Sequence, residues 1–204
     1  MTIGMYRMGI AAALMVAAIA TTTGCDAMDS EPQNTGPAET SQAAKELQTR
    51  PTLEDTQAHL KQAFEDLAAY ASSLVPGMTW KWVSTDQYPS GCDAPFDQTT
   101  GRQYHMPDYI TQGGDAAHGG GIPDDVWPVV RDKARQIAAD LGATESDPFP
   151  FNEKVGDRQA RFYGSNGTVL WLATRGISGD TGCRLPAADK ASTSSTPPTT
   201  AAQK

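Results

Sequence analysis

Positive charge is scarce in this sequence, whose 204 residues carry 16 lysines and arginines against 24 aspartates and glutamates. The formal net charge is −8, and no basic run interrupts the acidic balance. A nucleic-acid-binding protein needs a basic face that displaces counterions from phosphates. Electrostatic docking on anionic lipids needs a similar face. The composition therefore argues against both of these partners.

Motifs for metal binding and catalysis are missing as well. The three cysteines include no CxxC pair and the three histidines show no ligand spacing, so we predict no metal site and no cofactor. His118 opens a His-Gly-Gly-Gly run that resembles the oxyanion loop of esterases, but no GxSxG elbow exists and no histidine follows. We interpret the run as a glycine loop and expect a protein without enzymatic activity.

Large apolar side chains are rare at both ends of the mature chain. Hydrophobic residues make up 39% of the sequence, and residues 25–50 and 188–204 are rich in Ser, Thr, Pro, Gln and Ala. Such segments bury too little surface to offset the entropy lost on ordering. We therefore predict a disordered linker over 25–50, a single domain over 51–187 and a disordered tail over 188–204.

The first 25 residues are typical of an exported lipoprotein. A short segment with Arg7 precedes an apolar stretch over 8–20, which is too short to span a bilayer as a mature helix. The following Thr22-Thr23-Gly24 and Cys25 resemble a lipobox, although Thr22 stands where Leu or Val is usual. We predict a signal peptide over 1–24 and acyl chains, palmitate among them, on Cys25, which tether the domain to the outer face of the cell membrane. The alternative is an ordinary signal peptide with an unmodified Cys25.

Cys92 and Cys183 are the two remaining cysteines, and each directly follows a glycine. Export implies an oxidising compartment, where two cysteines allow a single intramolecular pairing. We predict a disulfide between them, which stabilises the domain by roughly 4 kcal/mol in the chain-entropy description. A catalytic or metal-binding thiol is the competing interpretation.

Hydrophobic periodicity predicts two helices, over about 52–74 and 124–141, each with an apolar stripe at helical spacing. Alternation predicts strands over 78–84, 104–110, 159–163, 168–174 and 177–185. Residues 164–167 form the clearest hairpin signal, and Pro107 marks 104–110 as an edge strand. The order αββαβββ gives an α+β two-layer sandwich with two helices on one face of an antiparallel sheet. A cone-shaped fold like that of nuclear transport factor 2 is the alternative.

Aromatic residues are the strongest candidates for ligand contact. Strand alternation places some of them on the sheet face away from the helices, where an uncovered surface would bind a glycan, a lipid or a protein of the cell envelope. Packing in the core is the competing role. The candidate ligand-facing residues are Trp80, Trp82, Tyr104 and Trp171.

Several features together resemble the LppA-like lipoproteins of mycobacteria: the lipobox, the Val75-Pro76-Gly77 helix end, Trp80-Lys81-Trp82, Gly91-Cys92 and the helix containing Trp127. The resemblance covers about residues 50–186 and implies a location in the mycobacterial cell envelope, with no activity to transfer. We therefore expect a membrane-anchored module that binds or organises an envelope component. The alternative is an extracytoplasmic hydrolase or glycan-processing enzyme that uses scattered carboxylates.

Overall fold

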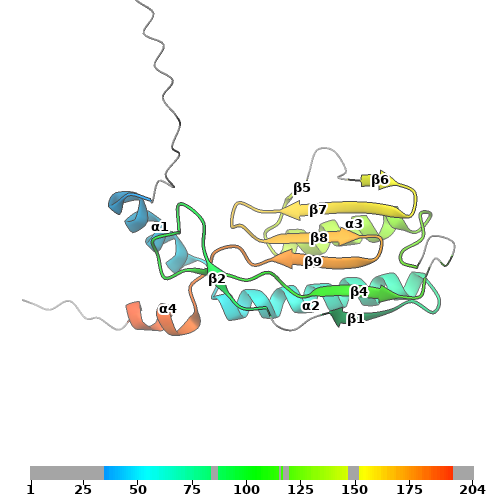
Figure 1. Ribbon diagram of the computed structural model, residues 1–204, viewed down its shortest axis with the longest axis horizontal. Helices are drawn as coiled ribbons and strands as arrows, with labels where there is room; N and C mark the ends of the chain where they lie inside the picture. The colour runs from blue at the N-terminus through cyan, green and yellow to red at the C-terminus, as the bar shows by residue number, and fades with distance from the viewer. Residues whose placement is uncertain (1–34, 84–86, 115, 117–119, 147–151, 195–204) are drawn as a thin grey trace, which may run out of the picture. The chain divides into compact units, whose positions relative to one another are not determined.

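Figure 1 shows the computed structural model, which describes residues 35–83, 87–114, 116, 120–146 and 152–194. The chain divides into two units, residues 1–33 and 34–204, and every described residue belongs to the second. A seven-stranded antiparallel sheet has the order β1-β4-β9-β8-β7-β5, with β6 paired to β7, and β2 and β3 form a separate pair. The strands are β1 (Thr79–Val83), β2 (Ser90–Gly91), β3 (Arg102–Gln103), β4 (Asp108–Gln112), β5 (Glu145–Ser146), β6 (Asn152–Lys154), β7 (Asp157–Tyr163), β8 (Val169–Ala173) and β9 (Gly176–Asp180).

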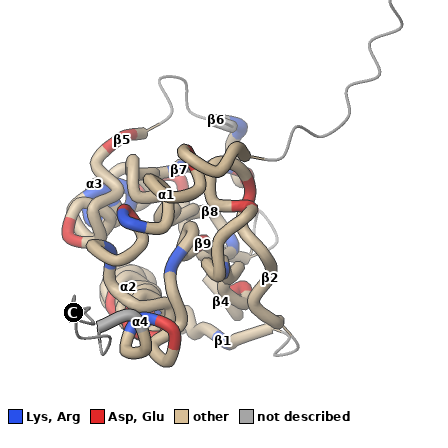
Figure 2. The backbone as a smooth tube through the Cα atoms, turned by 90° about the vertical axis from the view of Figure 1, so that its left-hand side faces the viewer, with Lys and Arg blue, Asp and Glu red and all other residues tan. Residues whose placement is uncertain are grey.

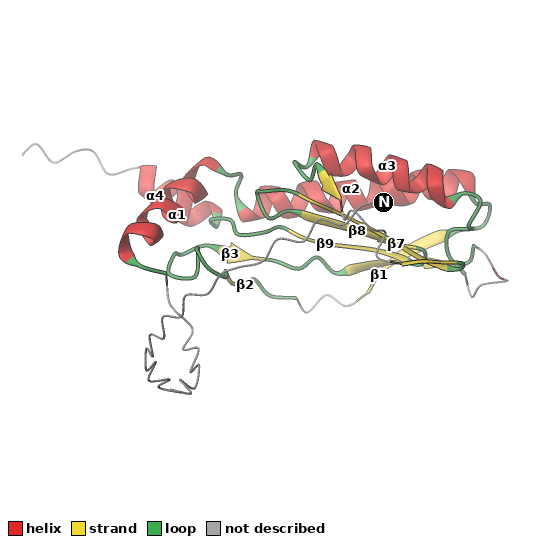
Figure 3. Cartoon of the chain, turned by 90° about the horizontal axis from the view of Figure 1, so that it is seen from above, coloured by secondary structure: helices red, strands yellow, loops and turns green. Residues whose placement is uncertain are grey.

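Two long helices, α2 (Leu53–Leu74) and α3 (Trp127–Asp140), lie on the same face of this sheet (Figure 3). The arrangement confirms the predicted α+β sandwich. Helix α2 begins where the sequence indicates, because the Thr52 side chain accepts a hydrogen bond from the Asp55 amide. The buried stripe of α2 packs with that of α3 against inward-facing strand residues, among them Phe162, Leu170 and Leu172.

The hairpin between β7 and β8 also follows the prediction. Gly167 has a positive φ of 80°, a conformation that glycine adopts without strain. The Asn166 side-chain oxygen accepts a hydrogen bond from the Thr168 amide at 2.9 Å, which closes the turn. The register pairs Tyr163 with Val169. Local turn chemistry thus fixes which face of β8 meets the helices.

Two further helices lie in segments that we predicted to be disordered. Helix α1 (Pro37–Thr49) occupies most of the predicted linker, and α4 (Ala187–Ser194) occupies the start of the predicted tail. The prediction of disorder is therefore wrong for both stretches. Leu47 of α1 is fully buried against Cys183 and Leu185. These partners are distant in sequence, so composition within the linker gives no sign of them.

The predicted edge strand over 104–110 is also corrected. Strand β4 begins after Pro107 and lies between β1 and β9, inside the sheet. Proline lacks an N–H and excludes a central ladder position only if it lies within the strand. Because Pro107 precedes β4, no ladder hydrogen bond is lost, and β1 forms the edge instead.

Candidate ligand-binding cleft

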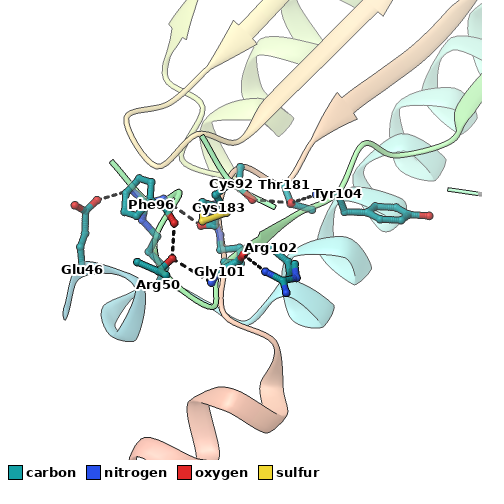
Figure 4. The surroundings of a disulfide bond; sticks show 12 residues. Glu46, Arg50, Cys92, Phe96, Gly101, Arg102, Tyr104, Thr181 and Cys183 are labelled. Atoms are coloured by element: carbon teal, nitrogen blue, oxygen red, sulfur yellow. Dashed lines mark hydrogen bonds and ion pairs between the residues drawn. A yellow bond between two sulfur atoms is a disulfide. The ribbon is translucent and has the colours of Figure 1, made fainter. Parts of the chain in front are cut away.

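The two cysteines of the domain are joined in a disulfide, as the sequence predicts. The Cys92–Cys183 bridge has an S–S distance of 2.01 Å and a Cα–Cα distance of 5.7 Å (Figure 4). A Cβ atom on Gly101 would lie 2.5 Å from the Cys183 sulfur, so the loop needs glycine to approach the bridge. The bridge joins the chain near β2 to the segment that follows β9. Bridged sulfurs are no nucleophiles, so the pair has a structural role here.

The four candidate aromatic residues do not form a single platform. Trp80 and Trp82 face the helices, and the Trp80 indole N–H donates to the Ser72 hydroxyl of α2 at 3.1 Å. Trp171 lies between the buried Leu170 and Leu172 on β8 and points to the opposite face, where it lines a hollow of about 270 Å³. Only Trp82 and Tyr104 meet at one cleft.

This aromatic cleft has a volume of about 410 Å³ and runs along one flank of α2. Its lining is mostly apolar, and Glu54, Gln57 and Lys61 supply the polar rim. The full lining consists of Glu54, Gln57, Ala58, Lys61, Trp82, Tyr104, Met106 and Pro107. A volume in this range fits a small organic ligand.

A stack of rings supports the cleft from below. Trp82 stacks on Phe64, with ring centroids 5.9 Å apart, and on Tyr109, with centroids 4.3 Å apart. The Lys61 ammonium lies 5.9 Å from the centroid of the Trp82 ring. Packing between α2, β1 and β4 therefore holds Trp82 in place.

The opposite wall of the cleft is fixed by backbone hydrogen bonds. The Tyr104 amide donates to the Thr181 hydroxyl at 3.0 Å, and the Met106 amide donates to the Gly179 carbonyl at 2.8 Å. These bonds fasten the segment before β4 to the end of β9. Figure 4 shows the Tyr104 ring extending away from the disulfide. Contacts within the fold thus position both walls of the cleft.

Metal-binding and charged groups are dispersed in the described part of the chain. Within the described ranges, no three His, Cys, Asp or Glu residues gather closely enough to hold a metal ion. His105 pairs with Asp180 at 2.9 Å, and both side chains are about half exposed. Figure 2 shows basic and acidic positions scattered among uncharged stretches of the described chain. Cys25 and His118, which figure in the sequence predictions, lie outside the described residues.

No described helix is both long enough and apolar enough to cross a membrane. The fold and the cleft define a class: a disulfide-bridged α+β sandwich with a preformed aromatic cleft of ligand size. The chain belongs to the LppA family, a lipoprotein family confined to pathogenic Mycobacterium, whose sequence model matches residues 28–187. The family resemblance predicted from the sequence is thereby confirmed.

A solved structure supports the fold independently. The chain is similar to the putative lipoprotein LppA from Mycobacterium tuberculosis, with a TM-score of 0.58 and 16% identity. The match covers 75% of this chain and 90% of that one. At this identity the likeness shows the fold alone. No curated protein matches the chain.

Sequence reasoning missed part of what surrounds the cleft and the bridge. Helix α1 carries a weak signal, because Pro37 stands at its first turn and Ala43 and Leu47 are four residues apart. Met106 and Pro107 carry no signal of cleft lining, since their position depends on the pairing of β4 with β9. Contacts across the sheet, rather than local pattern, bring these residues to Trp82.

Proposed function

We propose that this chain is a cell-envelope lipoprotein, anchored through acyl chains on Cys25, whose domain binds a small amphipathic ligand without transforming it. Membership of a lipoprotein family supports the anchor. The aromatic cleft between α2 and the segment before β4 is the observation that supports the binding role. The proposal places the ligand close to the membrane surface, where the lipid anchor holds the domain.

The lining favours a ligand with an apolar body and an uncharged polar head. Tyr104, Met106 and Pro107 offer apolar surface, which gains about 25 cal/mol for each Å² removed from water. The charged rim groups already have partners: Lys61 pairs with Glu65, and Glu54 accepts a hydrogen bond from the Ala187 amide at 2.9 Å. A charged head would have to compete for them. An uncharged hydroxyl-bearing head would not.

Octyl glucoside is a suitable probe, because it joins a short alkyl chain to an uncharged sugar in about 20 non-hydrogen atoms, a size suited to such a pocket. Calorimetric titration below its micelle-forming concentration measures its affinity for the protein with Cys25→Ser. Ala58→Trp fills the cleft from the exposed flank of α2, and we expect binding to weaken at least tenfold. Ala69→Trp is the matched control, because Ala69 is exposed on the same helix outside the cleft.

Equal affinity of the two tryptophan variants, or no binding by the unaltered cleft, would contradict the proposal. The same samples test the enzymatic alternative. If octanol and glucose accumulate during the titration, the protein hydrolyses the probe and is a glycan-processing enzyme instead. An unchanged probe with cleft-dependent heat supports a binding module.

A further inference from the structure

Arg184 is a buried cation with an incomplete set of partners. Its side chain is 1% exposed. The guanidinium donates to the Asn166 and Cys183 carbonyls at 2.6 and 2.8 Å, and to the Thr168 and Thr56 hydroxyls at 2.7 and 3.3 Å. An arginine side chain has five N–H donors. One N–H of the guanidinium therefore has no acceptor among these four.

All four acceptors are uncharged. Within the described part of the chain, no carboxylate lies within ion-pair distance of Arg184. The neighbouring Arg50 donates to the same two carbonyls, which places a second positive charge nearby, but Arg50 has its own partner in Glu46. Burial, and to a smaller extent the charge of Arg50, lowers the pKa of Arg184 to about 10. A buried charge of this kind is costly unless an anion compensates it.

Arg184 also lines a second cleft beside α2, which is larger than the aromatic cleft. This polar cleft has a volume of about 490 Å³ and lies between α2, α3 and the β7–β8 turn. The aromatic cleft is lined by α2 residues such as Ala58 and Lys61, whereas the polar cleft is lined by His59, Gln62 and Asp66. Helical spacing places these two sets on opposite flanks of the helix. The two clefts are therefore separate sites.

The charges of the polar cleft differ between its floor and its rim. Arg184 is buried, whereas Asp66 on α2 and Asp140 on α3 are exposed. Asp66 accepts a hydrogen bond from Gln62 at 2.9 Å, and Asp140 makes no ion pair within the described residues. A simple anion would be attracted by Arg184 at the floor and repelled by the carboxylates at the rim. A simple cation would be attracted by the rim and repelled by the floor.

We propose that the polar cleft binds a zwitterionic, peptide-like ligand, whose carboxylate contacts Arg184 and whose ammonium group faces Asp66 and Asp140. A carboxylate is a strong acceptor for an arginine N–H, and in this proposal it accepts from the one N–H of Arg184 that has no acceptor among the four. This site is independent of the amphipathic ligand proposed for the aromatic cleft.

The experiment uses the full lipidated chain in phosphatidylcholine nanodiscs, with empty nanodiscs as the blank. Calorimetry compares three probes: the dipeptide L-alanyl-L-alanine, its N-acetyl derivative, which lacks the ammonium group, and its C-terminal amide, which lacks the carboxylate. We expect the dipeptide to bind at least tenfold more tightly than either derivative. Equal binding of the amide, equal binding of the N-acetyl form, or no heat from the dipeptide would each overturn the proposal.

Two variants separate the ends of the ligand. Asp140→Asn removes one of the two rim charges, so the affinity for the dipeptide should fall toward that for the N-acetyl form. Asp132→Asn is the matched control, because Asp132 lies on the same helix outside the cleft and pairs with Arg131 and Arg135. Equal effects of the two variants would overturn the proposal. Arg184→Gln should abolish selectivity for the carboxylate; if this variant does not fold, the probe series and the Asp140 variant decide the matter alone.

Discussion

Removal of the Cys92–Cys183 bridge should lower the stability of the domain by an amount that follows from the loop it closes. The two cysteines are 91 residues apart. In the chain-entropy description, a loop of this length is worth about 4.6 kcal/mol at room temperature. For a domain of this size, each kcal/mol shifts the melting temperature by about 2–4 °C, so the loss is roughly 9–18 °C. This loss is a large part of the stability of a typical domain.

Alanine is the better replacement, because Cys183 is 6% exposed and a serine hydroxyl there would be buried. Thermal unfolding followed by circular dichroism compares Cys92→Ala, Cys183→Ala and the double variant under oxidising conditions. Each single variant already breaks the bridge, so the double variant should melt at nearly the same temperature as the singles. Unaltered protein treated with dithiothreitol should approach them.

Additive losses in the double variant would refute the reasoning, because they would show two independent packing contributions instead of one shared bond. Thiol titration of the unfolded, unreduced protein gives a second check. With Cys25→Ser, no free thiol should be found. Two free thiols would show that the pair is not bridged in the protein.

Three further predictions concern the anchor and the attachment of α1. Metabolic labelling with a fatty-acid probe should label the unaltered chain but not Cys25→Ala, and equal labelling would place the anchor elsewhere. Leu47→Ala should lower the free energy of unfolding by about 2–5 kcal/mol, because Leu47 is fully buried. Leu74→Ala is the control and should change the free energy of unfolding by less than about 0.5 kcal/mol, because the Leu74 side chain is 39% exposed. Equal unfolding midpoints of the two variants in urea would contradict this prediction. Hydrogen bonds from Thr35 lower the pKa of Asp97 below its usual value of 3.8. The hydrogen bonds to Asp97 therefore contribute fully to stability above pH 3.8 and are lost as the pH falls through the lower pKa of the folded state. The chemical shift of the Thr35 amide should report this loss in NMR. A shift that changes at higher pH would disprove the assignment.

Local patterns in the sequence were enough to predict the elements that depend on near neighbours. The apolar residues of α2 recur at helical spacing and Thr52 caps its first turn, so the predicted range 52–74 closely matches the helix observed. The β7–β8 hairpin follows from its four-residue turn. The pairing of Cys92 with Cys183 follows from their number, since two cysteines in an oxidising compartment allow a single bridge.

Predictions that required knowledge of distant neighbours were incomplete. Alternation correctly separates Trp171 from Leu170 and Leu172, but it does not show which side of β1 meets α2. Trp80 and Trp82 were candidates for an exposed face and instead pack toward the helices, where only Trp82 reaches a cleft. The sheet order, rather than the alternation of one strand, determines that outcome.

The sequence by itself determined the secondary-structure class, the disulfide pairing and the family resemblance, because each depends on local spacing or on a count of residues. Tertiary structure alone decided that residues 37–49 fold as helix α1, that β4 lies inside the sheet and that Arg184 is buried. Leu47 is ordered by Cys183 and Leu185, which lie more than 130 residues away along the chain. Burial and hydrogen bonding act between groups that are near in space, so a charge such as Arg184 acquires its unusual environment only when α2, the β7–β8 turn and the segment after β9 meet.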